Sequence, residues 1–230
     1  MRLMTLSSLV MVVQTGMAAD GTTLVHRFLE SGTPELASYA ARRVLTASTR
    51  GGRMQAKLEA WTYLDGNGSF RVEVTCSEGS GLVQKRVLLA ALEAEGKSRQ
   101  EGEISQAAIS RDNYEFVPAA PTLEGLREIR LQPRRKSRML IEGSVFVQEA
   151  SADLVRVQGR LSKTPSWWTR RVDVIRRYAR IGGVRVPVEM TSTADVRLVG
   201  PSSFSMTYHY AMINGERLSD EVASDCDSDD

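Results

Sequence analysis

The chain has 230 residues, of which 42% are hydrophobic and 25% are charged, and its formal net charge at pH 7 is +2. This composition excludes a wholly disordered chain and a polytopic membrane protein, and the length suits one large β-rich domain or at most two small ones. Charge is unevenly spread, because residues 216–230 hold seven acidic residues and one basic residue, Arg217. The rest of the chain is therefore basic.

The first residues are typical of a secretory signal. Arg2 supplies a charged start, residues 9–13 are apolar, and Gly16-Met17-Ala18 offers a small-residue cleavage site. The apolar stretch is too short to span a bilayer. We therefore expect residues 1–19 to be a signal peptide and the protein to be periplasmic or otherwise exported, the alternative being a frayed N-terminal helix.

The next segment predicts a short helix followed by three strands. Thr23 is a suitable N-cap for a helix that ends near residue 31. Gly51-Gly52 separates two runs of about ten residues, and a type I′ hairpin turn needs positive φ at both of its central positions. A second turn at residues 65–68 leads into another alternating run, so residues 37–77 predict a three-stranded meander.

Between residues 82 and 99 the apolar period changes from two to that of a helix. Leu88 and Leu92 share one broad apolar face, and a second short helix is expected over residues 104–109. Gly96 weakens the first helix late in its course.

Five or six segments between residues 126 and 210 alternate apolar and polar residues. Val184, Val186, Val188 and Met190, for example, alternate with polar or charged residues and Pro187. A strict period of two places apolar side chains on one face, so these segments predict long antiparallel strands. The fold class expected is mainly β with helices (α+β): a half-open antiparallel β-barrel of long meander strands closed by a helical insertion. We expect one domain over residues 20–215 and a disordered acidic tail over residues 216–230.

The sequence offers little reactive chemistry. His26 and His209 have no metal-binding partners at useful spacing, and no nucleophile elbow, phosphate loop or zinc spacing is present. We therefore expect no enzymatic activity, no cofactor and no metal. Two cysteines make no disulfide framework, so Cys76 is expected to be a small core residue with a buried free thiol, and Cys226 an exposed free thiol in the tail.

Two surface features could serve binding. In Trp167-Trp168, adjacent strand residues face opposite ways, so one indole could be exposed at the barrel rim and contact a membrane or partner, or both could cap the core. Arginines cluster at residues 134–138 and 170–180, which suits acidic partners or simply the solvated sides of strands. They lack interleaved aromatics, so no nucleic acid is expected.

The combination of a secretion signal, long antiparallel strands and a helical insertion resembles the periplasmic lipoprotein-carrier superfamily, the outer-membrane lipoprotein-sorting proteins. Residues 69–74, 85–95 and 153–210 carry the resemblance. It is a similarity of pattern that covers most of the chain between the signal and the tail, and it includes no short diagnostic motif. It implies a carrier that holds the acyl chain of a lipid or lipidated protein in the apolar concave face, with peripheral membrane contact possible.

The alternating residues of the strands and the apolar face of the helix would line such a cavity. The candidate lining is Phe70, Val72, Val74, Leu88, Leu89, Leu92, Val157, Val186, Val188, Phe204, Met206 and Tyr208. Two alternatives remain open: these residues could be ordinary core, and the scaffold could be a protein-binding or envelope-sensing module without lipid transport. An open cavity would favour the carrier, and a cavity filled by Leu88 and Leu92 would favour the module.

Overall fold

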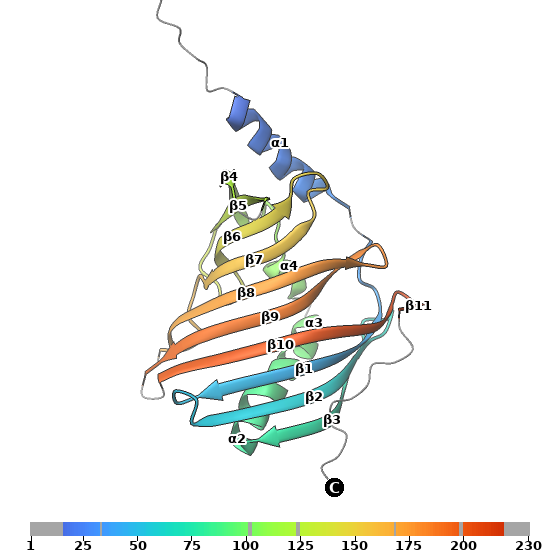
Figure 1. Cartoon of the computed structure of the whole chain (residues 1–230), viewed down its shortest axis with the longest axis vertical. Helices are drawn as coiled ribbons and strands as arrows, with labels where there is room; N and C mark the ends of the chain where they lie inside the picture. The colour runs from blue at the N-terminus through green and yellow to red at the C-terminus, as the bar shows by residue number, and fades with distance from the viewer. Residues whose placement is uncertain are drawn as a thin grey trace, which may run out of the picture.

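One large antiparallel sheet dominates the protein (Figure 1). The computed structural model describes residues 16–32, 34–100, 103–122, 125–167, 169–197 and 200–218. Within these residues the sheet has 11 strands in the order β3-β2-β1-β10-β9-β8-β7-β6-β5-β4, with β11 paired to β10. Since β3 and β4 are both edge strands, the barrel is half open. This confirms the predicted fold class.

The strands are long and mostly joined by short turns. Their bounds are β1 Tyr39–Thr49, β2 Met54–Leu64, β3 Phe70–Gly79, β4 Tyr114–Pro121, β5 Leu126–Pro133, β6 Ile141–Gln148, β7 Leu154–Leu161, β8 Thr169–Ile181, β9 Val184–Val196, β10 Gly200–Ile213 and β11 Glu216–Arg217. The β1–β2 turn contains Gly51 and Gly52, both with positive φ, as the sequence predicts. The meander over residues 37–77 and the later strands are therefore present as expected.

Helices cover one face of this sheet and one of its ends (Figure 1). They are α1 Gly16–Glu30, α2 Gly81–Val83, the π-helical segment η1 Gln84–Leu89, α3 Ala90–Gln100 and α4 Ile104–Ala107. The predicted helix over residues 82–99 is thus present, although η1 interrupts its α-helical geometry. Gly96 has a packing role, because an added Cβ would lie 2.9 Å from Cδ1 of Phe70. The residue that weakens the helix is the one that lets α3 approach β3.

The core lies between the helices and the concave face of the sheet, in three clusters. The first cluster joins α1 to the β4–β7 region and includes Phe28 and Val145. The second joins α2, η1 and α3 to β1, β2 and β10, and it includes Leu88, Leu92 and Leu45. The third cluster contains side chains from β1, β2, β9 and β10, and it includes Tyr39, Val186 and Ile213.

Two expectations for Cys76 are wrong. The register of β2 and β3 shifts between Glu59 and Ala60, so that Val74 is opposite Ala60 and Cys76 is opposite Glu59. This β-bulge turns Cys76 away from the face of Val74. Cys76 is also disulfide-bonded rather than a free thiol. Cys226, the other cysteine of the chain, lies outside the described residues.

The ends of the chain were expected to be a signal peptide and an acidic tail. Residues 1–15 and 219–230 lie outside the described residues, so both expectations stay predictions. Glu216 and Arg217 form β11, and the side chain of Leu218 packs against the third core cluster.

Candidate functional site: a groove between α1 and β4

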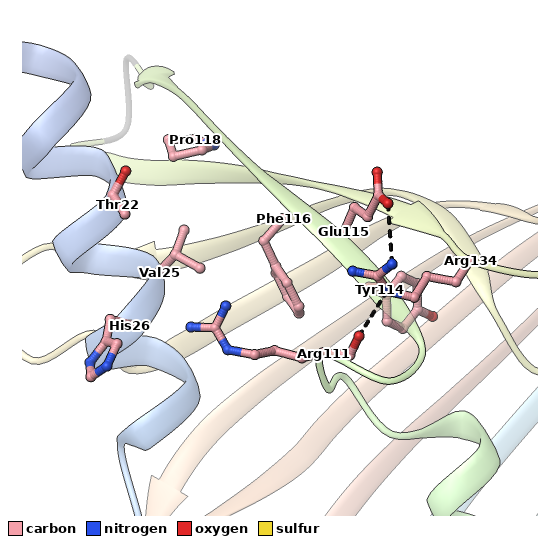
Figure 2. Close-up of a pocket in the computed structure, with 9 residues that line it drawn as sticks. All are labelled: Thr22, Val25, His26, Arg111, Tyr114, Glu115, Phe116, Pro118 and Arg134. Carbon is pink, nitrogen blue, oxygen red and sulfur yellow. Dashed lines mark hydrogen bonds and ion pairs between the residues drawn. The ribbon is translucent and has the colours of Figure 1, made fainter.

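A groove of about 350 Å³ lies between α1 and β4 (Figure 2). Its lining, here called the α1 groove, is Thr22, Val25, His26, Arg111, Tyr114, Glu115, Phe116, Pro118 and Arg134. A second hollow of about 300 Å³ shares His26 and Arg111 with it and extends along α1 to Leu29 and Ile109. Each volume lies at the lower end of the range for small-molecule sites.

The floor of the α1 groove is apolar and firmly packed. Val25 and Tyr114 are buried beneath it. The Phe116 ring lies 6.4 Å from that of Phe28 and 6.3 Å from that of Tyr114, in tilted or edge-on arrangements that aromatic pairs favour. This floor can contact an apolar ligand.

Gly21 lets α1 and β4 approach each other. A Cβ added at Gly21 would lie 2.7 Å from Cβ of Pro118, closer than side chains tolerate. Proline in β4 also suits an edge strand, because it removes a donor that no further strand could use. α1 and β4 are therefore in close contact at Gly21 and Pro118.

The mouth of the groove carries charged side chains. The Arg134 guanidinium donates hydrogen bonds to the Arg111 carbonyl at 2.9 Å and to the Glu115 carboxylate at 3.2 Å. His26 Nδ1 lies 2.7 Å from the Glu30 carboxylate. Figure 2 shows the Arg111 side chain reaching across the groove towards α1. Within the described part of the chain, no carboxylate forms an ion pair with Arg111, which leaves one uncompensated cation at the mouth.

The C-terminal end of α1 is tied to the sheet by polar contacts. Arg27 donates hydrogen bonds to the carbonyls of Glu149 (3.3 Å) and Ala150, and Arg185 donates one to Ser31 Oγ at 3.0 Å. Arg185 is itself held by Asp153, which also accepts from Arg180. Hydrogen bonds from Arg180, with Arg185 adding to them, outweigh burial and hold the pKa of the Asp153 carboxyl below its usual range. The helix is therefore fixed at its C-terminal end, next to the β6–β7 turn.

A buried ion pair ties α3 to the sheet in the other half of the molecule. Arg43 on β1 is 1% exposed and donates to the Glu95 carboxylate at 2.6 Å and to the Tyr39 hydroxyl at 2.6 Å. Its guanidinium also lies over the Tyr208 ring at 4.6 Å. Burial alone would raise the pKa of Glu95, but Arg43 and Arg99 outweigh it and hold the pKa below its usual value.

Eleven of the twelve predicted lining residues are distributed over the three core clusters, and none of the twelve lines the α1 groove. Seven of them belong to or pack against the second cluster: Val72, Leu88, Leu89, Leu92, Phe204, Met206 and Tyr208. Phe70, Val186 and Val188 belong to or pack against the third, and Val157 lies in the first. Leu88 and Leu92 are both 0% exposed, whereas Val74 is 48% exposed near the open edge of the sheet.

The sequence-based reasoning missed the α1 groove. Thr22, Val25, His26 and Leu29 recur at a spacing of three and four residues, which places them on one side of a helix. That signal was present but could not show which sheet edge the helix would face. No residue of β4 had been proposed as part of a site.

Comparisons with known proteins identify no family for this chain. No protein-family model matches the sequence, and no curated protein matches it. Among solved structures, the fold is similar to that of an outer membrane lipoprotein-sorting protein domain from Vibrio parahaemolyticus, with a TM-score of 0.39 and 9% identity over 84% of this chain and 93% of that one.

The described residues contain no group of three or more His, Cys, Asp and Glu side chains placed to hold a metal ion. Among the helices built from them, none is long and apolar enough to cross a membrane.

Proposed function

We propose that the protein is an exported, non-enzymatic carrier that binds the acyl chain of a lipid or lipidated protein in the α1 groove. The observation that supports this proposal is the combination of an apolar floor with an uncompensated Arg111 at the mouth. Such a site matches an amphiphile, whose chain would lie on Phe116 and Val25 while its anionic end meets Arg111.

Hydrophobic burial supplies the driving force in this proposal. Burying apolar surface stabilises a complex by about 25 cal/mol per Å², or about 0.8 kcal/mol for each methylene group. The groove needs no base, metal or cofactor to use this energy. Because α1 forms one wall, its distance from β4 would set how much of the chain is enclosed.

The matched variants Thr22→Trp and Thr23→Trp test the proposal. Both threonines are exposed neighbours on α1, but only Thr22 lines the groove. In a titration with a fluorescent fatty acid, Thr22→Trp should weaken binding about tenfold or more by filling the groove, whereas Thr23→Trp should bind like the unchanged protein. Equal affinities of the two variants, or no binding by the unchanged protein, would contradict the proposal.

A second candidate function rests on the filled concave face. Leu88 and Leu92 are fully buried against the sheet, so their side chains occupy part of the concave face under α3. This favours a protein-binding or envelope-sensing module on the same scaffold. A purified protein that binds no fatty acid but crosslinks to a specific envelope protein would support this candidate.

A further inference from the structure

The connections between consecutive strands are sorted by charge between the two ends of the sheet. In an antiparallel meander, successive connections alternate between the ends. The β1–β2, β5–β6, β7–β8 and β9–β10 connections share one end, and the β1–β2, β7–β8 and β9–β10 connections lie on the left in Figure 1. We call the described residues of these four connections, 50–53, 134–140, 162–167 and 197, the cationic rim.

The cationic rim contains basic residues and no acidic residue in its sequence. The basic residues are Arg50, Arg53, Arg134, Arg135, Lys136, Arg138, Lys163 and Arg197. The opposite end has the reverse composition, since the β2–β3, β4–β5, β6–β7, β8–β9 and β10–β11 connections contain no basic residue. Their acidic residues are Asp65, Glu124, Glu149 and Asp153.

Most of the charge on the cationic rim is not neutralised locally. Arg134 and Lys136 pair with Glu115 and Glu142, and Arg135 donates to the Asn113 side chain. The remaining cations form no ion pair with any described carboxylate, and all of them are exposed: Arg50, Arg53, Arg138, Lys163 and Arg197. The adjoining α4–β4 connection adds one basic residue, Arg111, and one acidic residue, Asp112, so the formal charge of this end is unchanged, although Arg111 forms no ion pair with a described carboxylate.

An exposed indole accompanies these charges. The side chain of Trp167, in the β7–β8 connection, is 75% exposed, the most exposed of the large hydrophobic side chains that the structure describes. Tryptophan is favoured at the boundary between water and hydrocarbon, where its ring is apolar and its N–H remains able to donate. Of the two alternatives for Trp167-Trp168, an exposed indole is the one found for Trp167, whereas the side chain of Trp168 lies outside the described residues.

We infer that the cationic rim docks the protein on the anionic phospholipid headgroups of a bilayer, with Trp167 at the interface. Tips of hairpins that end at one side of a half-barrel can meet a flat surface together, whereas a single concave pocket would suit a small anion. Lysine and arginine are attracted to anionic lipid surfaces, and the attraction falls off within a Debye length. At the opposite end Glu149 pairs with Arg127, and Asp153 pairs with Arg180 and Arg185, so the unpaired cations of the cationic rim set the orientation.

This docking would place the α1 groove near the membrane. Arg134 belongs both to the cationic rim and to the groove lining, and Arg111 lies beside it. A chain that leaves the bilayer at the rim would therefore meet the groove first at Arg111 and Arg134. The docking surface itself goes beyond the proposed carrier function and does not depend on it.

Vesicle co-sedimentation of the full chain tests the inference without any groove ligand. We expect binding to vesicles of phosphatidylcholine mixed with phosphatidylglycerol, loss of binding at raised ionic strength, and little binding to phosphatidylcholine alone. The Arg53→Glu/Arg197→Glu variant should bind at least about tenfold more weakly. As a control, Arg130→Glu reverses an exposed charge in the middle of β5 and should bind nearly as well as the unchanged protein. Circular dichroism melting of each variant checks that it is folded.

Three results would overturn the inference. The first is equal binding to neutral and anionic vesicles. The second is a loss of binding by the Arg130→Glu control as large as that of the Arg53→Glu/Arg197→Glu variant. The third is binding to heparin that depends on the cationic rim, with no binding to vesicles. The last result would assign the cationic rim to a polyanionic macromolecule in place of a membrane. Since the vesicle and heparin experiments contain no fatty acid, their outcome is separate from that of the Thr22→Trp titration.

Discussion

At the scale of single residues, Arg43 and Glu95 form a buried ion pair that links the sheet to α3. The Arg43 guanidinium is almost fully buried, so an uncompensated charge there would be costly, and Glu95 from α3 supplies the compensation. The pair joins two segments that are 52 residues apart in the sequence. It is therefore a contact that holds the helical insertion on the sheet.

Replacing Glu95 with Gln should lower the free energy of unfolding by about 2–3 kcal/mol at neutral pH, because Arg43 loses its anionic partner. The folded-state pKa of Glu95 is lowered below its unfolded value of about 4.3. The stabilisation is thus complete above that unfolded value and is lost as the pH falls through the folded-state pKa. Urea unfolding at a series of pH values should show the two proteins converging in acid.

Glu93→Gln is the matched control for this experiment. Glu93 is exposed on the same helix and forms no ion pair with the described residues. Its substitution should change the free energy of unfolding only slightly. A destabilisation by Glu95→Gln that is the same at every pH would show that the loss is one of packing and not of the charged pair.

At the scale of elements, the helical insertion is docked by apolar side chains on one face. Leu88 and Leu92 are fully buried against β1, β2 and β10, whereas Leu82, at the start of the same insertion, is 52% exposed. The free energy of docking therefore comes from the middle of the insertion.

Leu92→Ala should lower the free energy of unfolding by about 2–5 kcal/mol, because it leaves a cavity among residues that are already in contact. Leu82→Ala removes the same atoms from an exposed position and should cost less than about 0.5 kcal/mol. Denaturant unfolding of the two variants measures the difference. Similar small losses for both would mean that the insertion is not docked on the sheet in solution.

The sequence predicted most of these elements because period-two and helical patterns are local. The six strands β5–β10, the Gly51-Gly52 turn and the helical insertion were all predicted correctly. The bulge beside Cys76 was not predicted. One extra residue in β3 moves the following side chains to the other face of the sheet, and the alternation of apolar and polar residues does not reveal it. The α1 groove was also missed, because it depends on which sheet edge α1 packs against, and that is set by contacts such as Gly21 with Pro118.

At the scale of the whole molecule, the two ends of the sheet differ in charge and the two halves of the concave face differ in packing. The half under α3 holds the buried side chains of Leu88 and Leu92, and the half beside α1 holds the groove. The cationic rim lies at the end of the sheet that carries Arg111 and Arg134 of the groove. This arrangement gives a path from a membrane surface to an apolar site without requiring α3 to move.

The most direct measurement of this account is photocrosslinking with a fatty acid that carries a diazirine on its chain, followed by peptide mass spectrometry. The account predicts labelled peptides from α1 and β4 around Val25 and Phe116, and their loss when unlabelled fatty acid competes. Labelling confined to the helical insertion and β1–β3 would place the ligand in the other half of the concave face. That result, or the absence of any competed labelling, would contradict the claim that the α1 groove is the binding site.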